Sequence, residues 1–445
     1  MIKEFFTLPD TDLTQESSVD PLGIQRIWTS YGQDIFGDKL TTIANDLRIY
    51  TFNLFHNYLI NQLFKNYPEE IQRAKENYRS WTTDADVKMG LLIFLEDLVT
   101  HIFYYKWKSD GENNYGILGM NKVKIVHRSE DPSKIYLAAY KGAGLLKNQV
   151  NLGMTGRYKG PFMNMEFFDR SFTYIEKTWL QAEKILSKWA NGMQLEADLE
   201  KLIIKQLLSQ KRRDYPRLSL EEIRSTSSWR KVQEGYLLCF GKRNLPREIK
   251  RFWEYKLGLD SGAPNALFKK IRELTPGEYK YHYRIFSSAV KELNSEPLEK
   301  LKLTKIIEIE PFLSYSEYLF RYLAQPGIAA FKHEVGNIQS LRGKINAHGN
   351  FSFQVLHPRL NTLLKVMVNN KTDEEWLQGM MEYHRNIMEE RGGTAWLDFN
   401  GDTFKHHFSP RLSEETNTVD KYMAREFWYH TYYLETLYSI YQGLN

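Results

Sequence analysis

The chain has 445 residues, of which 42% are hydrophobic and 14% aromatic, a composition that supports two or three packed domains and excludes a disordered protein. Its single cysteine, Cys239, excludes an intramolecular disulfide framework and metal sites built on paired thiolates, and it fits the reducing cytosol. Because the net charge is only +5, any strongly basic surface must arise from the way charge is distributed.

Two helices are predicted in the first hundred residues. Between 38 and 64 apolar residues recur every three or four positions, which predicts one long amphipathic helix. A second helix is predicted from 84 to 107, with Thr83 or Asp84 placed to cap its first turn. This part of the chain is therefore expected to be helical.

Neither a membrane anchor nor a secretion signal is expected. The most apolar stretch, 89–105, is interrupted by Glu96, Asp97 and His101, which makes it too polar and too short to cross a bilayer. Residues 1–9 lack the charged head and long apolar run of a secretory signal. We therefore expect a cytoplasmic protein without membrane partners.

The composition of the sequence changes between 109 and 161, where glycines separate short β-prone runs. Strands are predicted at 123–126 and 135–140. Helical periodicity returns over 174–189 and 195–208. The glycines from 153 to 160 accompany two basic residues and are interpreted as a tight basic loop rather than an anion site, because no strand-then-helix frame surrounds them.

The C-terminal third contains two well-delimited elements. Thr372 and Glu375 form a capping box that begins a helix, which ends at Gly392. Asn400-Gly401 is flanked by β-prone residues, which predicts a β-hairpin near 396–408.

The chain is expected to close with a helix over 419–443, so the predicted fold is mainly α, multi-helix, with minor β-structure near 120–140 and in the hairpin. A further break is expected at 260–264, where small residues cluster before Pro264. The predicted domains are a helical N-terminal domain with a glycine-rich β/turn segment (1–160), a basic helical middle domain (161–295) and a C-terminal α domain with the hairpin (296–445).

Positive charge is concentrated in one central segment. Residues 211–291 hold 19 Lys and Arg against 9 Asp and Glu, a net of +10, so the rest of the chain carries a net of −5. The densest clusters, which we take as candidate phosphate-binding residues, are Lys211, Arg212, Arg213, Arg217, Arg230, Lys231, Lys242, Arg243, Arg247, Lys250 and Arg251.

Such clusters neutralise phosphates and release counterions, the main sequence-independent source of nucleic-acid affinity. The segment therefore predicts a nucleic-acid-binding surface, with DNA expected rather than RNA. Two other interpretations remain open, a surface matched to an acidic protein and a simply solvated face. Aromatic residues in this segment are no more frequent than in the whole chain, so the segment shows no special enrichment of base-stacking side chains.

No catalytic motif is recognisable. The chain has neither a Walker phosphate-binding loop nor a Gly-x-Ser-x-Gly nucleophile elbow. Cys239 lies in an apolar run, which predicts a buried and inert thiol. We expect no cofactor, and a non-enzyme is favoured over an enzyme.

Two acidic or histidine-rich patterns resemble parts of metal sites. Six of the 11 histidines lie between His333 and His407, but their spacing with Asp398 and Asp402 matches no metal site and is better explained by the hairpin. Glu308 and Glu310 would share one face of a strand at 306–310, yet no acid-x-Lys follows as a metal-dependent nuclease core requires. No metal is therefore expected.

Three patches share an order with a group of bacterial proteins. The patches are 23–27 with the following Phe36-Gly37 and 48–50, then 115–119, then 153–160. Together these first 160 residues resemble uncharacterised bacterial proteins encoded in anti-phage defence gene clusters beside helicases. The resemblance implies a bacterial multi-protein machine that acts on nucleic acid, and it carries no catalytic residue over.

The sequence thus favours a nucleic-acid-binding, non-catalytic subunit of a bacterial defence or DNA-processing complex, with other protein subunits as partners. A metal-dependent nuclease with a nonconsecutive site and a protein-binding scaffold are the alternatives.

Overall fold

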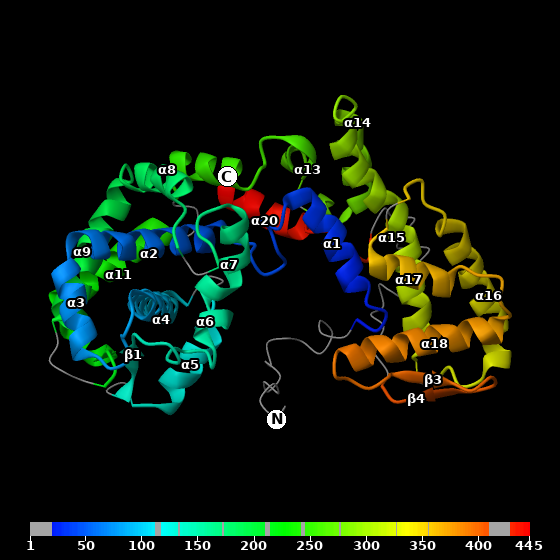
Figure 1. Cartoon of the computed structure of the whole chain (residues 1–445), viewed down its shortest axis with the longest axis horizontal. Coiled ribbons are helices and arrows are strands. Elements are labelled where there is room, and N and C mark those ends of the chain that lie inside the picture. The colour runs from blue at the N-terminus through cyan, green and yellow to red at the C-terminus, as the bar shows by residue number, and fades with distance from the viewer. Residues whose placement is uncertain are drawn as a thin grey trace. The chain divides into compact units, whose positions relative to one another are not determined.

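A computed structural model describes residues 20–111, 117–131, 134–170, 173–209, 214–241, 245–275, 277–325, 327–354, 356–408 and 428–445. The described chain is mainly helical, and its two sheets are antiparallel pairs of three-residue strands (Figure 1). This confirms the predicted fold class. Within these ranges, none of the helices is long and apolar enough to cross a bilayer.

Cα packing divides the chain into two compact units, each made of two sequence segments. Unit 1 comprises Met1–Phe36 and Ser261–Glu435, and unit 2 comprises Gly37–Asp260 and Thr436–Asn445. The predicted break at 260–264 coincides with one of the transitions between units. The division into 1–160, 161–295 and 296–445 stays a prediction.

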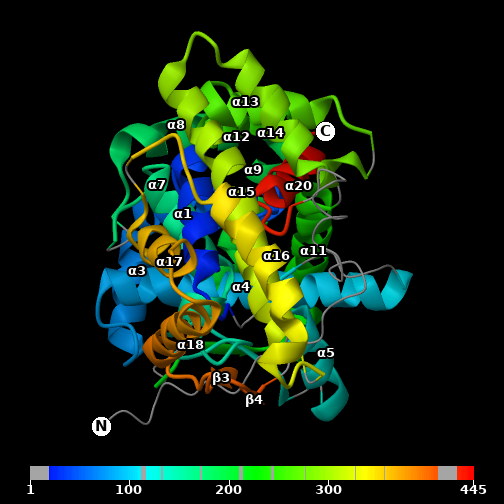
Figure 2. The same cartoon turned by 90° about the vertical axis from the view of Figure 1, so that its right-hand side faces the viewer.

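Unit 1 is built around the 27-residue helix α15 (Pro297–Leu323), which packs against α1, α13, α14 and α16. Figure 2 shows α15 and α16 side by side. The other elements of this unit are α1 (Ile24–Phe36), α13 (Gly262–Arg272), the 3-10 turn η3 (Glu278–Lys280), α14 (His282–Glu292), α16 (Phe331–His348), α17 (Pro358–Met367), α18 (Asp373–Glu390), β3 (Leu397–Phe399) and β4 (Phe404–His406).

Unit 2 is built around α4 (Asp84–Asp110), which Figure 1 shows end-on, with α2 (Leu47–Asn66), α5, α6, α11 and β1 packed against it. Residues 91–104 of α4 are buried on every side, so this helix forms the centre of the core. The other elements are α3 (Pro68–Asn77), α5 (Met120–Ser129), β1 (Tyr136–Ala138), α6 (Gln149–Leu152), α7 (Met154–Asn164), α8 (Glu176–Leu186), α9 (Ala190–Ile203), the π-helical turn η2 (Ile204–Leu208), β2 (Arg217–Ser219), α10 (Leu220–Ser225), α11 (Ser227–Phe240) and α12 (Arg247–Lys256). The last helix, α20 (Leu434–Leu444), begins in unit 1 and continues in unit 2.

The two buried acids of α4 bind the glycine-rich segment. The Glu96 carboxylate accepts hydrogen bonds from the backbone N–H of Met154 (3.2 Å) and Thr155 (2.6 Å) and from Nε2 of Gln149 (2.6 Å). Residues 154–164 are helix α7 and Glu96 satisfies its first N–H groups, so the interpretation of 153–160 as a loop is wrong. Burial raises the pKa of Glu96 and raises that of Asp97 to about 8.

Capping residues, helical periodicity and a turn dipeptide predicted several elements correctly. Thr83 caps α4 and Thr372 caps α18, each in a capping box, and the helices predicted near 174–189 and 195–208 correspond to α8 and to α9 with η2. The hairpin is also confirmed: β3 and β4 pair antiparallel, and Gly401 has a φ of +94° in the turn.

Three other predictions are wrong in whole or in part. The helix predicted over 38–64 begins only at Leu47, because Asp46 caps it and residues 37 and 38 have positive φ. The run 123–126 belongs to helix α5, and 306–310 belongs to α15 rather than to a strand. The predicted last helix is confirmed from 434 onward as α20, whereas 428–433 is not helical and 419–427 lies outside the described residues.

Candidate nucleic-acid interface

The predicted phosphate-binding residues that the structure describes all lie in unit 2. They are Arg217, Arg230, Lys231, Arg247, Lys250 and Arg251. The other five, Lys211, Arg212, Arg213, Lys242 and Arg243, lie outside the described residues. Unit 2 holds 36 Lys and Arg against 27 Asp and Glu, a net of +9, whereas unit 1 has 24 against 28, a net of −4.

Helix α12 carries three of these cations on or beside its outer face. Arg247 and Arg251 are exposed and one turn apart, and Lys250 beside them is half-buried. Phe252 and Trp253 hold the helix by its inner face, where the indole N–H of Trp253 donates to a hydroxyl of α2. Arg247, Lys250 and Arg251 thus form what we call the α12 surface.

Further cations approach the C-terminal end of this helix. The pKa of Lys256 is lowered, first by burial and then by the charges of Lys39 and Lys177, against an opposing contribution from Glu166. Positive charge therefore gathers near α12 from three segments of unit 2.

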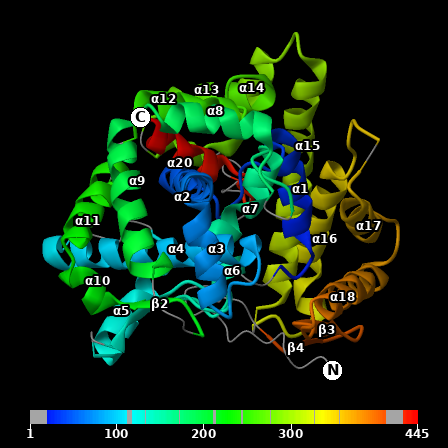
Figure 3. The same ribbon diagram turned by 60° about the vertical axis from the view of Figure 1, so that its left-hand side comes forward.

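Arg217, Arg230 and Lys231 do not join the α12 surface. Arg230 lies ten residues before the end of α11, about 15 Å along the helix axis. Figure 3 shows α12 at one end of unit 2, and α5 and α10 at the other end. The Arg217 guanidinium lies 4.9 Å from the centroid of the Tyr136 ring on β1, and Arg230 pairs with Glu234 on an exposed face. The candidate residues that the structure describes therefore do not form one surface.

A second surface forms where the C-terminal end of α4 meets α5, α10 and α11, and we call it the aromatic-cation surface. It consists of Tyr104, Tyr105, Trp107, Lys108, Lys124, His127, Arg224 and Trp229.

Two cations of this surface lie on aromatic rings. The Arg224 guanidinium is 4.2 Å from the centroid of the Tyr105 ring, and Nη1 donates to the Tyr105 hydroxyl at 3.1 Å. The Lys124 ammonium is 4.0 Å from the centroid of the Trp107 ring. The Trp229 ring packs edge-on against Tyr105 at a centroid distance of 6.0 Å.

His127 connects the two halves of this surface as a neutral ring. It stacks on Tyr104 at a centroid distance of 4.2 Å, and its Nε2 is 3.0 Å from Nδ1 of His101. Burial lowers the pKa of His127, and the charges of Lys108 and Arg224 lower it further. The positive charge at neutral pH therefore comes from Lys and Arg.

The elements around the aromatic-cation surface carry an excess of positive charge. Residues 105–110, 120–129, 220–225 and 227–234 together hold eight Lys or Arg and four Asp or Glu, a net of +4. Two of the acids are already neutralised, because Asp110 pairs with Lys106 and Glu234 with Arg230.

Sequence reasoning missed this surface because it searched for charge in one continuous segment. A signal was present in the run Phe103-Tyr-Tyr-Lys-Trp-Lys108, where aromatic and basic residues alternate at the end of a helix. Its partners come from α5 and α10, about 20 and 115 residues further along the chain, and only the fold brings them together.

The side chains considered for catalysis or metal binding have structural partners. Cys239 is buried, as predicted, and burial raises the pKa of its thiol to about 12. Glu308 accepts hydrogen bonds from Ser352, and the Asp398 carboxylate accepts one from Nε2 of His407 at 2.9 Å. Among the described residues, no group of three or more His, Cys, Asp and Glu could hold a metal ion.

Comparison with known proteins gives no relative. Neither a protein-family model, nor a curated protein, nor a solved structure matches this chain.

Proposed function

We propose that the chain binds nucleic acid without acting on it chemically, through the aromatic-cation surface of unit 2. In this proposal it is a subunit of a bacterial defence or DNA-processing complex, as the resemblance of its first 160 residues implies. The observation that carries the proposal is the interleaving of cations and aromatic rings, with Arg224 on Tyr105 and Lys124 on Trp107.

The chemistry of this surface suits a single strand. Lys and Arg neutralise phosphates, and aromatic rings or guanidinium planes stack on unpaired bases. An arginine held on a ring has lost part of its side-chain freedom before the ligand arrives, so binding a phosphate costs less entropy. Single-stranded nucleic acid is therefore the expected ligand.

The α12 surface is proposed as a source of phosphate contacts only. Arg247, Lys250 and Arg251 are positive, but the exposed aromatic residue on that helix face is a single tyrosine, Tyr255. We expect it to add electrostatic attraction and little base stacking.

Fluorescence anisotropy with dye-labelled single-stranded and double-stranded DNA and RNA tests the proposal. The first variant reverses three charges of the aromatic-cation surface, Lys108→Glu, Lys124→Glu and Arg224→Glu. The second reverses Arg247, Lys250 and Arg251 to Glu. The third is a matched control that reverses Lys280, Lys291 and Lys332, three exposed cations of unit 1.

We expect the first variant to lose most of its affinity for single strands, the second to lose less, and the control to bind like the parent. Trp107→Ala should weaken binding of single strands by about 1–3 kcal/mol, the contribution of one stacked base, and should affect duplexes less. If the parent binds no nucleic acid at low salt, or if all three charge-reversal variants bind alike, the proposal is wrong.

A further inference from the structure

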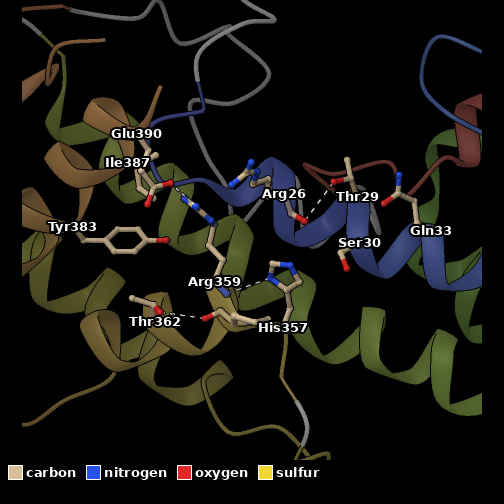
Figure 4. Close-up of a pocket in the computed structure, with 11 residues that line it drawn as sticks. Arg26, Thr29, Ser30, Gln33, His357, Arg359, Thr362, Tyr383, Ile387 and Glu390 are labelled. Atoms are coloured by element: carbon tan, nitrogen blue, oxygen red, sulfur yellow. Dashed lines mark hydrogen bonds and ion pairs between the residues drawn. The ribbon is translucent and has the colours of Figure 1, made fainter. Parts of the chain in front are cut away.

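Unit 1 contains a polar pocket that the proposed function does not use. It has a volume of about 610 Å³ and lies between α1 and the helices α17 and α18 (Figure 4). Pockets of this size hold small organic ligands such as cofactors. The pocket belongs entirely to unit 1, so it is independent of the aromatic-cation surface.

Two arginines supply the charge at one end of the pocket. The Arg359 side chain is only 14% exposed, and its Nη2 lies 2.6 Å from the Glu390 carboxylate. Gly23 packs closely enough that a Cβ there would lie 2.8 Å from Nη1 of Arg359, so this guanidinium is held in place. Arg26 projects from α1 and is exposed, and within the described chain its side chain has no hydrogen-bond or ion-pair partner.

The positive charge of Arg26 and Arg359 exceeds the negative charge of Glu390, the one carboxylate among the described residues that line the pocket. The hydrogen bond from Arg359 lowers the pKa of Glu390 first, and the charges of Arg359 and Arg26 lower it further. The side chains that line the pocket thus include two arginines and one carboxylate. The excess, together with the unpaired N–H groups of Arg26, favours an anionic ligand.

A histidine at the start of α17 adds a neutral donor. Nδ1 of His357 accepts a hydrogen bond from the backbone N–H of Arg359 at 3.3 Å. Burial lowers the pKa of His357, and the charges of Arg359 and Arg26 lower it further against an opposing contribution from Asp34, so the ring is neutral at pH 7 and carries its proton on Nε2. Figure 4 shows the ring on the side of the pocket that faces α1.

Uncharged polar side chains of α1 line the remainder. Arg26, Ser30 and Gln33 are spaced four and three residues apart, so they lie on one face of the helix. Within the described chain, the hydroxyl of Ser30 and the amide of Gln33 have no hydrogen-bond partner. Tyr383 and Ile387 provide an apolar wall opposite. Hydroxyl and amide groups beside an apolar wall suit a sugar joined to a flat ring.

We propose that this pocket binds a phosphomonoester of nucleotide size, with its phosphate at Arg26 and Arg359 and its sugar hydroxyls at Ser30 and Gln33. A phosphate group has three strong acceptor oxygens and can accept hydrogen bonds from both guanidinium groups at once, whereas a carboxylate has only two oxygens. In this proposal unit 1 binds a small molecule, and unit 2 binds nucleic acid.

Isothermal titration calorimetry of the full chain tests this inference with adenosine monophosphate, adenosine and inorganic phosphate. Adenosine monophosphate should bind, inorganic phosphate should bind more weakly, and adenosine should not bind. Arg26→Ala should weaken the binding of adenosine monophosphate about tenfold or more, the effect of one charge-assisted hydrogen bond. Because Arg26 is exposed and unpaired, the melting temperature of the variant should match that of the parent.

Two further variants make the test specific. Arg73→Ala removes an exposed arginine of unit 2 and should leave the affinity unchanged. Ser30→Ala should weaken adenosine monophosphate but not inorganic phosphate, because the hydroxyl faces the sugar. Equal affinity for adenosine and adenosine monophosphate, unchanged binding in Arg26→Ala, or no binding by any probe at millimolar concentration would overturn the proposal. Loss of binding in the Lys108, Lys124 and Arg224 reversal would also overturn it, since the phosphate would then bind to unit 2.

Discussion

The Glu310 side chain on α15 shows how one buried residue organises a distant segment of unit 1. It has no exposed surface, and its carboxylate accepts hydrogen bonds from the Tyr432 hydroxyl at 2.7 Å and the Tyr429 backbone N–H at 3.0 Å. Nδ1 of His430 lies 2.9 Å from the same carboxylate, and Nε2 lies 2.9 Å from the carboxylate of Glu317. One imidazole thus joins two acids and fastens residues 428–433 to α15.

This network predicts a stability that depends on pH. Burial alone would lower the pKa of His430, but the charge and hydrogen bond of Glu310, with those of Glu317, raise it from 6.5 to about 10. The protonated ring therefore stabilises the fold fully below pH 6.5, and this contribution disappears as the pH rises through about 10. Burial likewise opposes the shift of Glu317, yet its partners lower its pKa from 4.5 to about 2, so its contribution is lost only as the pH falls from 4.5 to 2.

His430→Gln should therefore destabilise unit 1 by about 3–5 kcal/mol, because two buried carboxylates lose their cation. Urea unfolding followed by circular dichroism at several pH values measures this loss. His407→Gln is the control: its partner Asp398 is partly exposed, so we expect a change below about 1 kcal/mol. A parent protein whose stability relative to His430→Gln stays constant between pH 6.5 and 10 would contradict the assignment.

The N-cap glycine of α7, Gly153, and a glycine inside the helix, Gly160, should respond differently to the same substitution. A Cβ at Gly153 would clash with the Glu96 carboxylate and lie 2.5 Å from the carbonyl oxygen of Gln149, whereas a Cβ at Gly160 would meet nothing within 4 Å. Gly153→Ala should therefore destabilise unit 2 by about 1–3 kcal/mol through overpacking. Gly160→Ala should change stability by less than about 1 kcal/mol, because the helix propensity of alanine is offset by the crowding of its Cβ against the following Pro161. Thermal unfolding of both variants measures the difference, and equal losses would show that Glu96 does not constrain this turn.

At the scale of elements, the capping boxes make the clearest prediction. Thr372 Oγ1 accepts the backbone N–H of Glu375 at 3.3 Å, and the Glu375 carboxylate accepts the N–H of Thr372 at 3.1 Å. Thr372→Ala should cost about 1 kcal/mol of stability in a urea titration. Thr394, an exposed threonine beyond the end of the same helix, provides the control, and Thr394→Ala should change stability by less than about 0.5 kcal/mol. Equal losses in the two variants would contradict a capping role.

The elements that sequence predicted correctly are those fixed by local chemistry. The capping boxes at Thr83 and Thr372 and the turn at Gly401 each depend on a few neighbouring residues, so their patterns are sufficient. The runs 123–126 and 306–310 are rich in valine and isoleucine, which suits a strand, but their neighbours on the same helix face also pack into a core. Tertiary packing therefore determines the secondary structure of these two runs, and a pattern of four or five residues contains too little information about that packing.

At the scale of the whole molecule, the fold separates charge in a way that the linear sequence does not show. The basic segment 211–291 crosses from unit 2 to unit 1 at Asp260, so +6 of its net charge lies in unit 2 and +4 in unit 1. Six of the 11 candidate site residues lie in the described part of unit 2, but the aromatic-cation surface draws on α4 and α5, which lie outside the segment. The sequence alone indicates where basic residues are concentrated. The contact between Arg224 and Tyr105 could be identified only from the fold.

The salt dependence of binding tests this division of charge. If Lys108, Lys124 and Arg224 contact phosphates of a single strand, reversing them should reduce the slope of log affinity against log salt by about 2, since each contact contributes about 0.7. The same number of reversals at Lys280, Lys291 and Lys332 changes the net charge of the chain equally. These three lie in unit 1, so the slope should stay that of the parent. A slope that falls equally in both variants would mean that affinity follows the total charge of the chain, and that the aromatic-cation surface has no special part in it.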